Sequence, residues 1–99
     1  MATTVTKMTE AQIAESLAEL PQWSEAGGVI QRTWQFKDFV HSMRFVGMVA
    51  DLAEKRQHHP DILVRYNKVT LSLSTHDAGG ITQKDFDLAR EADELATRI

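Results

Sequence analysis

The 99-residue chain contains no cysteine, only two prolines, and no long apolar run that is free of charged residues. Without cysteine there can be no disulfide, no thiolate nucleophile and no thiolate zinc site. The apolar stretches fall short of the ~20 residues that a membrane-spanning helix needs. The first residues also lack a basic segment followed by an apolar one, which is typical of secreted proteins. We therefore expect a cytoplasmic protein with no membrane partner.

Excess positive charge is also missing. Eleven Lys and Arg residues stand against 14 Asp and Glu residues, so the formal net charge is −3, and no dense basic cluster occurs. Binding to nucleic acid depends on basic residues that neutralise phosphates, so we expect no nucleic-acid partner. The length fits one domain. We assign residues 9–99 to that single domain and residues 1–8 to a flexible N-terminal arm.

The apolar pattern predicts an α+β fold in the order α-β-β-α-β-β-α. A helix begins at Thr9, with Gln12 as the partner in a capping box, and ends before Pro21. The later elements are strands 23–25 and 29–34, a helix over 39–57, strands 62–66 and 68–75, and a helix over 83–98 capped by Thr82. This order favours a four-stranded antiparallel sheet with three helices packed on one face. The other face, with Thr70, Ser72 and Ser74, is expected to stay wet.

The predicted helix over 39–57 is apolar around most of its circumference. One stripe, which we expect to be buried, consists of Phe39, Met43, Val46, Ala50 and Ala53. A second stripe beside it consists of Phe45, Val49 and Leu52. Such a helix must be covered on more than one side, so we expect it to form the core and to meet a partner subunit.

Three of the four histidines lie between residues 54 and 85. His58 and His59 stand where Pro60 ends the long helix, and His76 follows a strand whose period of two places it on the polar side. Imidazole has an unperturbed pKa of about 6.5, so acid–base catalysis is one hypothesis. A metal site is a second, although it would need His76 and an acid such as Asp77 or Glu54, and no usual metal motif occurs. Purely structural histidines are a third.

Two carboxylates could assist these histidines. Glu54 stands one helical turn before His58 and could fix its tautomer, or it could simply be solvated. Asp85 follows the Thr82 cap by three residues, where an acid stabilises a helix N-terminus. Trp23, beside the first hairpin, fits a core position better than a ligand platform.

A wider set of positions resembles one known family, the pterin-4a-carbinolamine dehydratases. The matching positions, at matching spacing, are Glu54, His58, His59, Pro60, Tyr66, His76 and Asp85. The resemblance extends from about residue 8 to the C-terminus. It implies a hydro-lyase that dehydrates 4a-hydroxytetrahydropterin to quinonoid dihydropterin and so recycles the cofactor of aromatic amino-acid hydroxylases. It also implies a homo-oligomer in which sheets join and long helices pack, with no metal and no bound cofactor.

The resemblance further implies roles for individual residues. His58 and His76 would form the acid–base pair, and His59 would bind or assist on the opposite face of the pterin ring. Glu54 would orient His58, and Asp85 would support His76. The residues expected to border the substrate are Trp23, Glu54, Gln57, Pro60, Ser74, Thr75 and Asp77. Ile62 departs from the pattern, because many members of the family carry Trp there.

Two other functions stay open on the same fold. One is a protein-binding module, since animal members of the family also act as dimerisation cofactors of a transcription factor. The other is a role in molybdopterin metabolism.

Overall fold

The computed structural model describes residues 6–99. Its elements are α1 (Glu10–Ala18), β1 (Ser24–Ala26), β2 (Val29–Gln35), α2 (Phe39–Arg56), β3 (Asp61–Arg65), β4 (Lys68–Leu73), the 3-10 turn η1 (His76–Ala78) and α3 (Gln83–Ala96). The predicted order of helices and strands is confirmed. The predicted arm falls partly on residues 1–5, outside the described residues. At its other end, the Met8 N–H donates to the Ile81 carbonyl over 2.8 Å, so the chain is already attached to the domain there.

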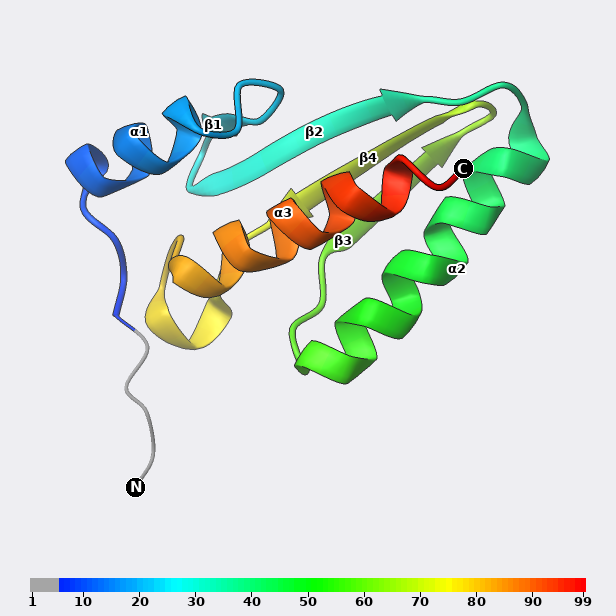
Figure 1. Ribbon diagram of the computed structural model, residues 1–99. Helices are drawn as coiled ribbons and strands as arrows, with labels where there is room; N and C mark the ends of the chain where they lie inside the picture. Colours follow the sequence, from blue (N-terminus) through cyan, green and yellow to red (C-terminus); the bar gives the residue numbers. More distant parts are fainter. Residues whose placement is uncertain (1–5) are drawn as a thin grey trace.

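The four strands form one antiparallel sheet in the order β1-β2-β4-β3. Helices α2 and α3 lie side by side across one face, and α1 lies beside β1 (Figure 1). Ile13 and Leu17 of α1 pack, partly buried, against the same core as the other helices. On the far face, the hydroxyls of Thr33 and Thr70 hydrogen-bond over 2.7 Å in an exposed position. The polar character expected of that face is confirmed.

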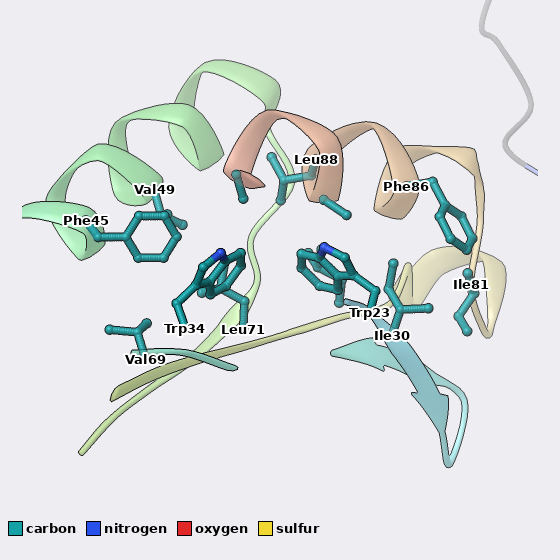
Figure 2. Packing of buried hydrophobic residues seen from close by; sticks show 13 residues of the cluster. Trp23, Ile30, Trp34, Phe45, Val49, Val69, Leu71, Ile81, Phe86 and Leu88 are labelled. Carbon is teal, nitrogen blue, oxygen red and sulfur yellow. The ribbon is translucent and has the colours of Figure 1, made fainter. Parts of the chain in front are cut away.

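The core lies between the sheet and the two long helices. Val69, Leu71 and Leu73 alternate along β4 and are fully buried. Figure 2 shows the rings of Trp23 and Trp34 above the strands, with Phe45 of α2 beside Trp34. The Trp34 and Phe45 ring centroids are 4.8 Å apart. Aromatic pairs at such distances add to the stability that area burial provides.

Helix α2 buries a different face from the one that we predicted. Its buried residues are Ser42, Phe45, Val49 and Ala53, so the second stripe faces the core. The first stripe is wrong as a buried set, because Phe39 and Met43 remain 49% and 43% exposed. Both faces are apolar, and periodicity alone does not say which of two neighbouring apolar faces meets the sheet.

The end of α2 reverses the chain in a Schellman motif. Gln57 adopts a left-handed conformation (φ 53°). The Gln57 N–H donates to the Glu54 carbonyl, and the His58 N–H donates to the Ala53 carbonyl over 3.1 Å. These are the two bonds that define the motif. The Gln57 side chain also donates to the Glu54 carbonyl, over 2.7 Å. The helix therefore stops at Arg56, and His58 no longer follows its spiral.

Candidate active site

The reversal after α2 directs His58 toward the first turn of α3. His58 Nε2 lies 2.6 Å from Asp85 Oδ1. The His58 side chain is 11% exposed, and that of Asp85 is fully buried. The expectation that Asp85 supports His76 directly is therefore wrong, because its partner is His58. A hydrogen bond to an ionised carboxylate is stronger than a neutral one, and burial keeps water from competing for it.

Two threonines complete the surroundings of Asp85. The Thr82 N–H donates to Asp85 Oδ2 over 2.9 Å, and the Thr75 hydroxyl donates to the same oxygen over 3.0 Å. The hydroxyls of Thr75 and Thr82 are themselves 2.7 Å apart. The predicted cap at Thr82 is confirmed, with Asp85 as the capping-box residue. The same carboxylate therefore caps α3 and holds His58.

His59 is exposed and bonds to Glu54. His59 Nε2 lies 2.5 Å from Glu54 Oε2, and the two side chains are 60% and 74% exposed. The expectation that Glu54 orients His58 is wrong. It assumed that helical spacing holds as far as His58, one turn after Glu54. The Schellman motif ends the helix earlier and exchanges the two partners.

His76 lies in η1, a short turn that follows β4. It is exposed, which confirms that it is not a core position, although β4 ends at Leu73, before the predicted strand end. The turn is closed by the Thr75 N–H, which donates to the Gly80 carbonyl over 2.9 Å. Thr75, directly before His76, also touches Asp85, which in turn holds His58. The end of α2 and the turn that carries His76 accordingly lie at the same end of the molecule (Figure 1).

Trp23 is part of the core rather than of a pocket wall. Its side chain is only 4% exposed, and its Nε1–H donates to the Asp93 carboxylate over 3.0 Å. The ring packs edge-on against Trp34, with centroids 5.5 Å apart. The core position read from the sequence is confirmed, and the implication that Trp23 borders the substrate is corrected, because the ring is buried.

The remaining predicted site residues differ in what they can offer a ligand. The Thr75 hydroxyl and the Gln57 amide already have protein partners. Pro60 and Ser74 are half-buried, and Asp77 is exposed. That these residues border a substrate stays a prediction.

A hollow of about 480 Å³ adjoins His58 between α2 and α3. Its other lining residues are Arg56, Lys84, Asp87, Leu88, Arg90 and Glu91. One wall is closed by two bonds from Arg56 to Glu91, of 2.8 and 2.7 Å. The Glu91 carboxylate raises the pKa of Arg56 through this hydrogen bonding. Sequence reasoning missed this wall, because nothing local pairs two residues on different helices.

His59 and His76 do not line that hollow. Convergence of all three imidazoles on one substrate stays a prediction. Across residues 6–99, no group of three or more His, Cys, Asp or Glu side chains is arranged to hold a metal ion. Within that same span, no helix has the length and apolar character to cross a membrane.

Residues 6–95 match the family model described as Pterin 4 alpha carbinolamine dehydratase. Two relatives are each named "Putative pterin-4-alpha-carbinolamine dehydratase". The protein from Picosynechococcus sp. (strain PCC 7002) is 49% identical over 90 residues, which are 91% of this chain and 98% of the relative. That from Roseiflexus sp. (strain RS-1) is 52% identical over 90 residues, 91% and 97% of the two chains.

Two solved structures resemble the fold. The "transcriptional coactivator/pterin dehydratase" from Brucella melitensis is 34% identical, with a TM-score of 0.88 over 92% of this chain and 99% of that one. A pterin dehydratase-like protein described as a RuBisCO assembly factor in the alpha-carboxysome is 23% identical. Its TM-score is 0.66 over 76% of this chain and 89% of that one. The second likeness concerns the fold alone. From the family match and the near-complete overlap with its relatives, the chain belongs to the pterin-4-alpha-carbinolamine dehydratase family.

Proposed function

We propose that this protein dehydrates a 4a-hydroxytetrahydropterin to the quinonoid dihydropterin and so recycles the cofactor of aromatic amino-acid hydroxylases. The observation that carries the proposal is the bond from His58 to the buried carboxylate of Asp85. The same carboxylate accepts a hydrogen bond from Thr75, the neighbour of His76. Family membership gives this arrangement its expected substrate.

The reaction needs one acid and one base. The C4a–O bond breaks, its electron pair stays on oxygen, and a proton from one imidazole converts the departing hydroxide to water. A second imidazole takes the proton from N5, and the N–H electron pair forms the C4a=N5 double bond. The substrate thus loses one water, and the two imidazoles regain their starting protonation by exchange with solvent. Positioned groups of this kind contribute about 10²–10⁴-fold to a rate.

His58 and His76 are the proposed acid–base pair. His59, oriented by Glu54, would assist on the opposite face of the ring, and Pro60, Ser74 and Asp77 would border it. In this reaction the protein supplies only proton transfers, which matches the choice of imidazole and carboxylate side chains.

We also propose that the protein is a homo-oligomer. Phe39, Val40 and Met43 on α2 are 49%, 57% and 43% exposed. At the sheet edge, β3 pairs with β4 on one side only, and its Leu63 is 55% exposed. Apolar surface and an unpaired strand edge both favour association with another chain. Sedimentation equilibrium would test this, and a monomer at micromolar concentration would refute it.

The same surface supports a second candidate function, a protein-binding module. The Brucella protein, whose name includes transcriptional coactivator, gives that candidate some weight. A binding module would need the apolar face of α2 and not the histidines, so histidine variants separate the two functions.

The test is stopped-flow dehydration of a synthetic carbinolamine with and without the protein. His58→Ala and His76→Ala should each slow the protein-catalysed rate by at least ~10²-fold. His41→Ala is the matched control, because that histidine bonds to Asp38 at the other end of α2. Wild-type rates in both His58→Ala and His76→Ala would refute the catalytic assignment and favour the binding module.

A further inference from the structure

We propose that Thr75 and Thr82 are positioning residues that act through Asp85. They hold His58 in the tautomer that carries its hydrogen on Nε2, which leaves Nδ1 as the nitrogen that exchanges a proton with the substrate. The tautomer follows from the hydrogen bonds alone, whereas the role of Nδ1 rests on the proposed dehydration.

The direction of the hydrogen bonds is fixed at both ends of the network. At one end, the backbone N–H of Lys84 can only donate, and it lies 3.2 Å from Thr82 Oγ1. At the other end, an ionised aspartate can only accept. Between them, the Thr75 hydroxyl donates its single hydrogen to Asp85 Oδ2 and therefore accepts from the Thr82 hydroxyl. The order of donation is Lys84, Thr82, Thr75 and then Asp85.

The bonds to Asp85 decide which nitrogen of His58 carries the hydrogen. Asp85 Oδ2 accepts from the Thr75 hydroxyl and the Thr82 N–H, and Asp85 Oδ1 is the partner of His58 Nε2 at 2.6 Å. Because that oxygen has no hydrogen to give, Nε2 must supply one. A neutral imidazole carries a single N–H, so its Nδ1 keeps a free lone pair.

Burial keeps water from replacing any member of this network. Thr82 and Asp85 are fully buried and Thr75 is 7% exposed. Removing a hydroxyl here leaves a polar partner without a hydrogen bond, which is costly in a buried place. The Thr33–Thr70 pair has the same 2.7 Å spacing but lies exposed, where water can substitute.

In the reaction, this tautomer makes His58 Nδ1 the base. Nδ1 takes the proton from N5 while the N–H electron pair forms the C4a=N5 bond, and the resulting imidazolium faces the Asp85 carboxylate. A buried aspartate behind a histidine acts in this way in serine hydrolases, where it fixes the tautomer and stabilises the cation. The imidazolium then returns its proton to solvent. Thr75 also precedes His76, so the same network fixes the turn that carries the second histidine.

The first experiment measures the tautomer without any substrate. ¹⁵N-labelled wild-type protein is studied by two-bond ¹H–¹⁵N correlation NMR at about pH 8.5, where an ordinary imidazole is neutral. The His58 signals are assigned by their loss in His58→Gln. We expect the pattern of the Nε2–H tautomer. The Nδ1–H tautomer, or an even mixture of both, would overturn the proposal.

The second experiment removes one hydroxyl. Thr75→Val keeps the shape of the side chain but removes one of the two donors that orient Asp85 Oδ2, so the carboxylate can turn away from His58 for part of the time. We therefore expect a mixed His58 tautomer and a kcat about tenfold lower, a part of the ~10²-fold that an acid–base group provides. KM should hardly change. Thr75→Ser should restore both the single His58 tautomer and the wild-type kcat. Thr70→Val is the matched control, expected to alter neither. A single tautomer with wild-type kcat in Thr75→Val, or a raised KM alone, would overturn the positioning role.

The two experiments also separate this inference from the proposed function. Wild-type protein with the Nε2–H tautomer but no dehydration would refute the function and the role of Nδ1, and would leave the tautomer standing. Dehydration by a protein whose His58 is in the Nδ1–H form would refute the inference and leave the function standing. If Thr75→Val does not fold, Thr75→Ala is measured in its place, with the same expected and contradicting outcomes, and the wild-type spectrum still decides the tautomer.

Discussion

His58 and His59 are neighbours in the chain, and each places its Nε2 within hydrogen-bond distance of a carboxylate, yet their surroundings are opposite. The His58–Asp85 pair has side chains 11% and 0% exposed, whereas those of the His59–Glu54 pair are 60% and 74% exposed. Water screens an exposed pair, so its contribution is about 0–1 kcal/mol. Breaking a buried pair leaves a desolvated group without a partner. The same two residue types therefore differ in strength because of where the fold places them.

A third pair falls between these two. His41 and Asp38, at the start of α2, have side chains 27% and 40% exposed. The three pairs thus form a series of increasing exposure within one small domain. If burial sets the strength of each pair, variants along the series should have graded effects.

The largest expected effect is that of Asp85→Ala. This change leaves the Thr75 hydroxyl, the Thr82 N–H and His58 Nε2 without their acceptor. At about 1–3 kcal/mol for each unpaired group, the free energy of unfolding should fall by at least ~3 kcal/mol in urea titration. Asp87→Ala, an exposed acid on the same helix, is the control and should stay within about 0.5 kcal/mol. A loss below ~1 kcal/mol in Asp85→Ala would contradict the importance of burial.

Trp23→Phe tests a partly buried pair outside the histidine site. It removes the Nε1–H that donates to Asp93, while Arg32 keeps its own 2.8 Å bond to that carboxylate. We expect a loss of about 1–3 kcal/mol in the free energy of unfolding and a melting temperature lower by several degrees. KM for the carbinolamine should be unchanged, because the ring is buried in the core. A raised KM with normal stability would restore Trp23 to the substrate site.

Glu54→Gln tests the exposed end of the series. An interaction of at most about 1 kcal/mol corresponds to a rate change of at most about fivefold. We therefore expect kcat/KM for the carbinolamine to fall by less than that factor, with no change in the urea midpoint. A loss near 10²-fold in stopped-flow assays would mean that Glu54 takes part in the chemistry itself.

Asp38→Asn tests the middle of the series, and we expect a small effect that depends on pH. The side-chain hydrogen bond of His41, and then its backbone N–H, lower the pKa of Asp38 below the ordinary value of 3.8. A lowered pKa in the folded state stabilises the protein above the unfolded pKa, and this stability is lost as the pH falls through the folded pKa. Asn caps a helix about as well as Asp, so the comparison isolates the charge.

The measurement for Asp38 is urea unfolding of both proteins from about pH 6 to about pH 2. The stability advantage of the wild type over Asp38→Asn should be present above about pH 4 and should shrink below it. An advantage that stays constant across this range would show that the His41 bond does not depend on the charge of Asp38.

Local rules account for much of the fold. The capping boxes at Thr9 and Thr82 begin α1 and α3 as predicted. The alternation of Val69, Leu71 and Leu73 assigned the buried face of β4 correctly, because a strand turns successive side chains to opposite faces. Each of these features depends on residues within about four positions of one another, and the sequence displays such spacing directly.

The candidate site shows where local rules stop. The sequence located the histidines and both carboxylates but paired them wrongly, with Glu54 on His58 and Asp85 on His76. The true partners depend on a left-handed Gln57, which ends α2 a residue earlier than the predicted helix and turns His58 inward. A glutamine with a left-handed backbone is uncommon, so the residue type at position 57 does not predict the turn.

By itself, therefore, the sequence determined the order of helices and strands, the faces of the sheet and the residue types gathered between Glu54 and Asp85. Only the tertiary structure decided which face of α2 is buried and which carboxylate meets which histidine. The reason is the separation along the chain over which each interaction acts. Periodicity and capping act over a single turn, whereas Asp85 reaches His58 across 27 residues once α3 packs beside α2.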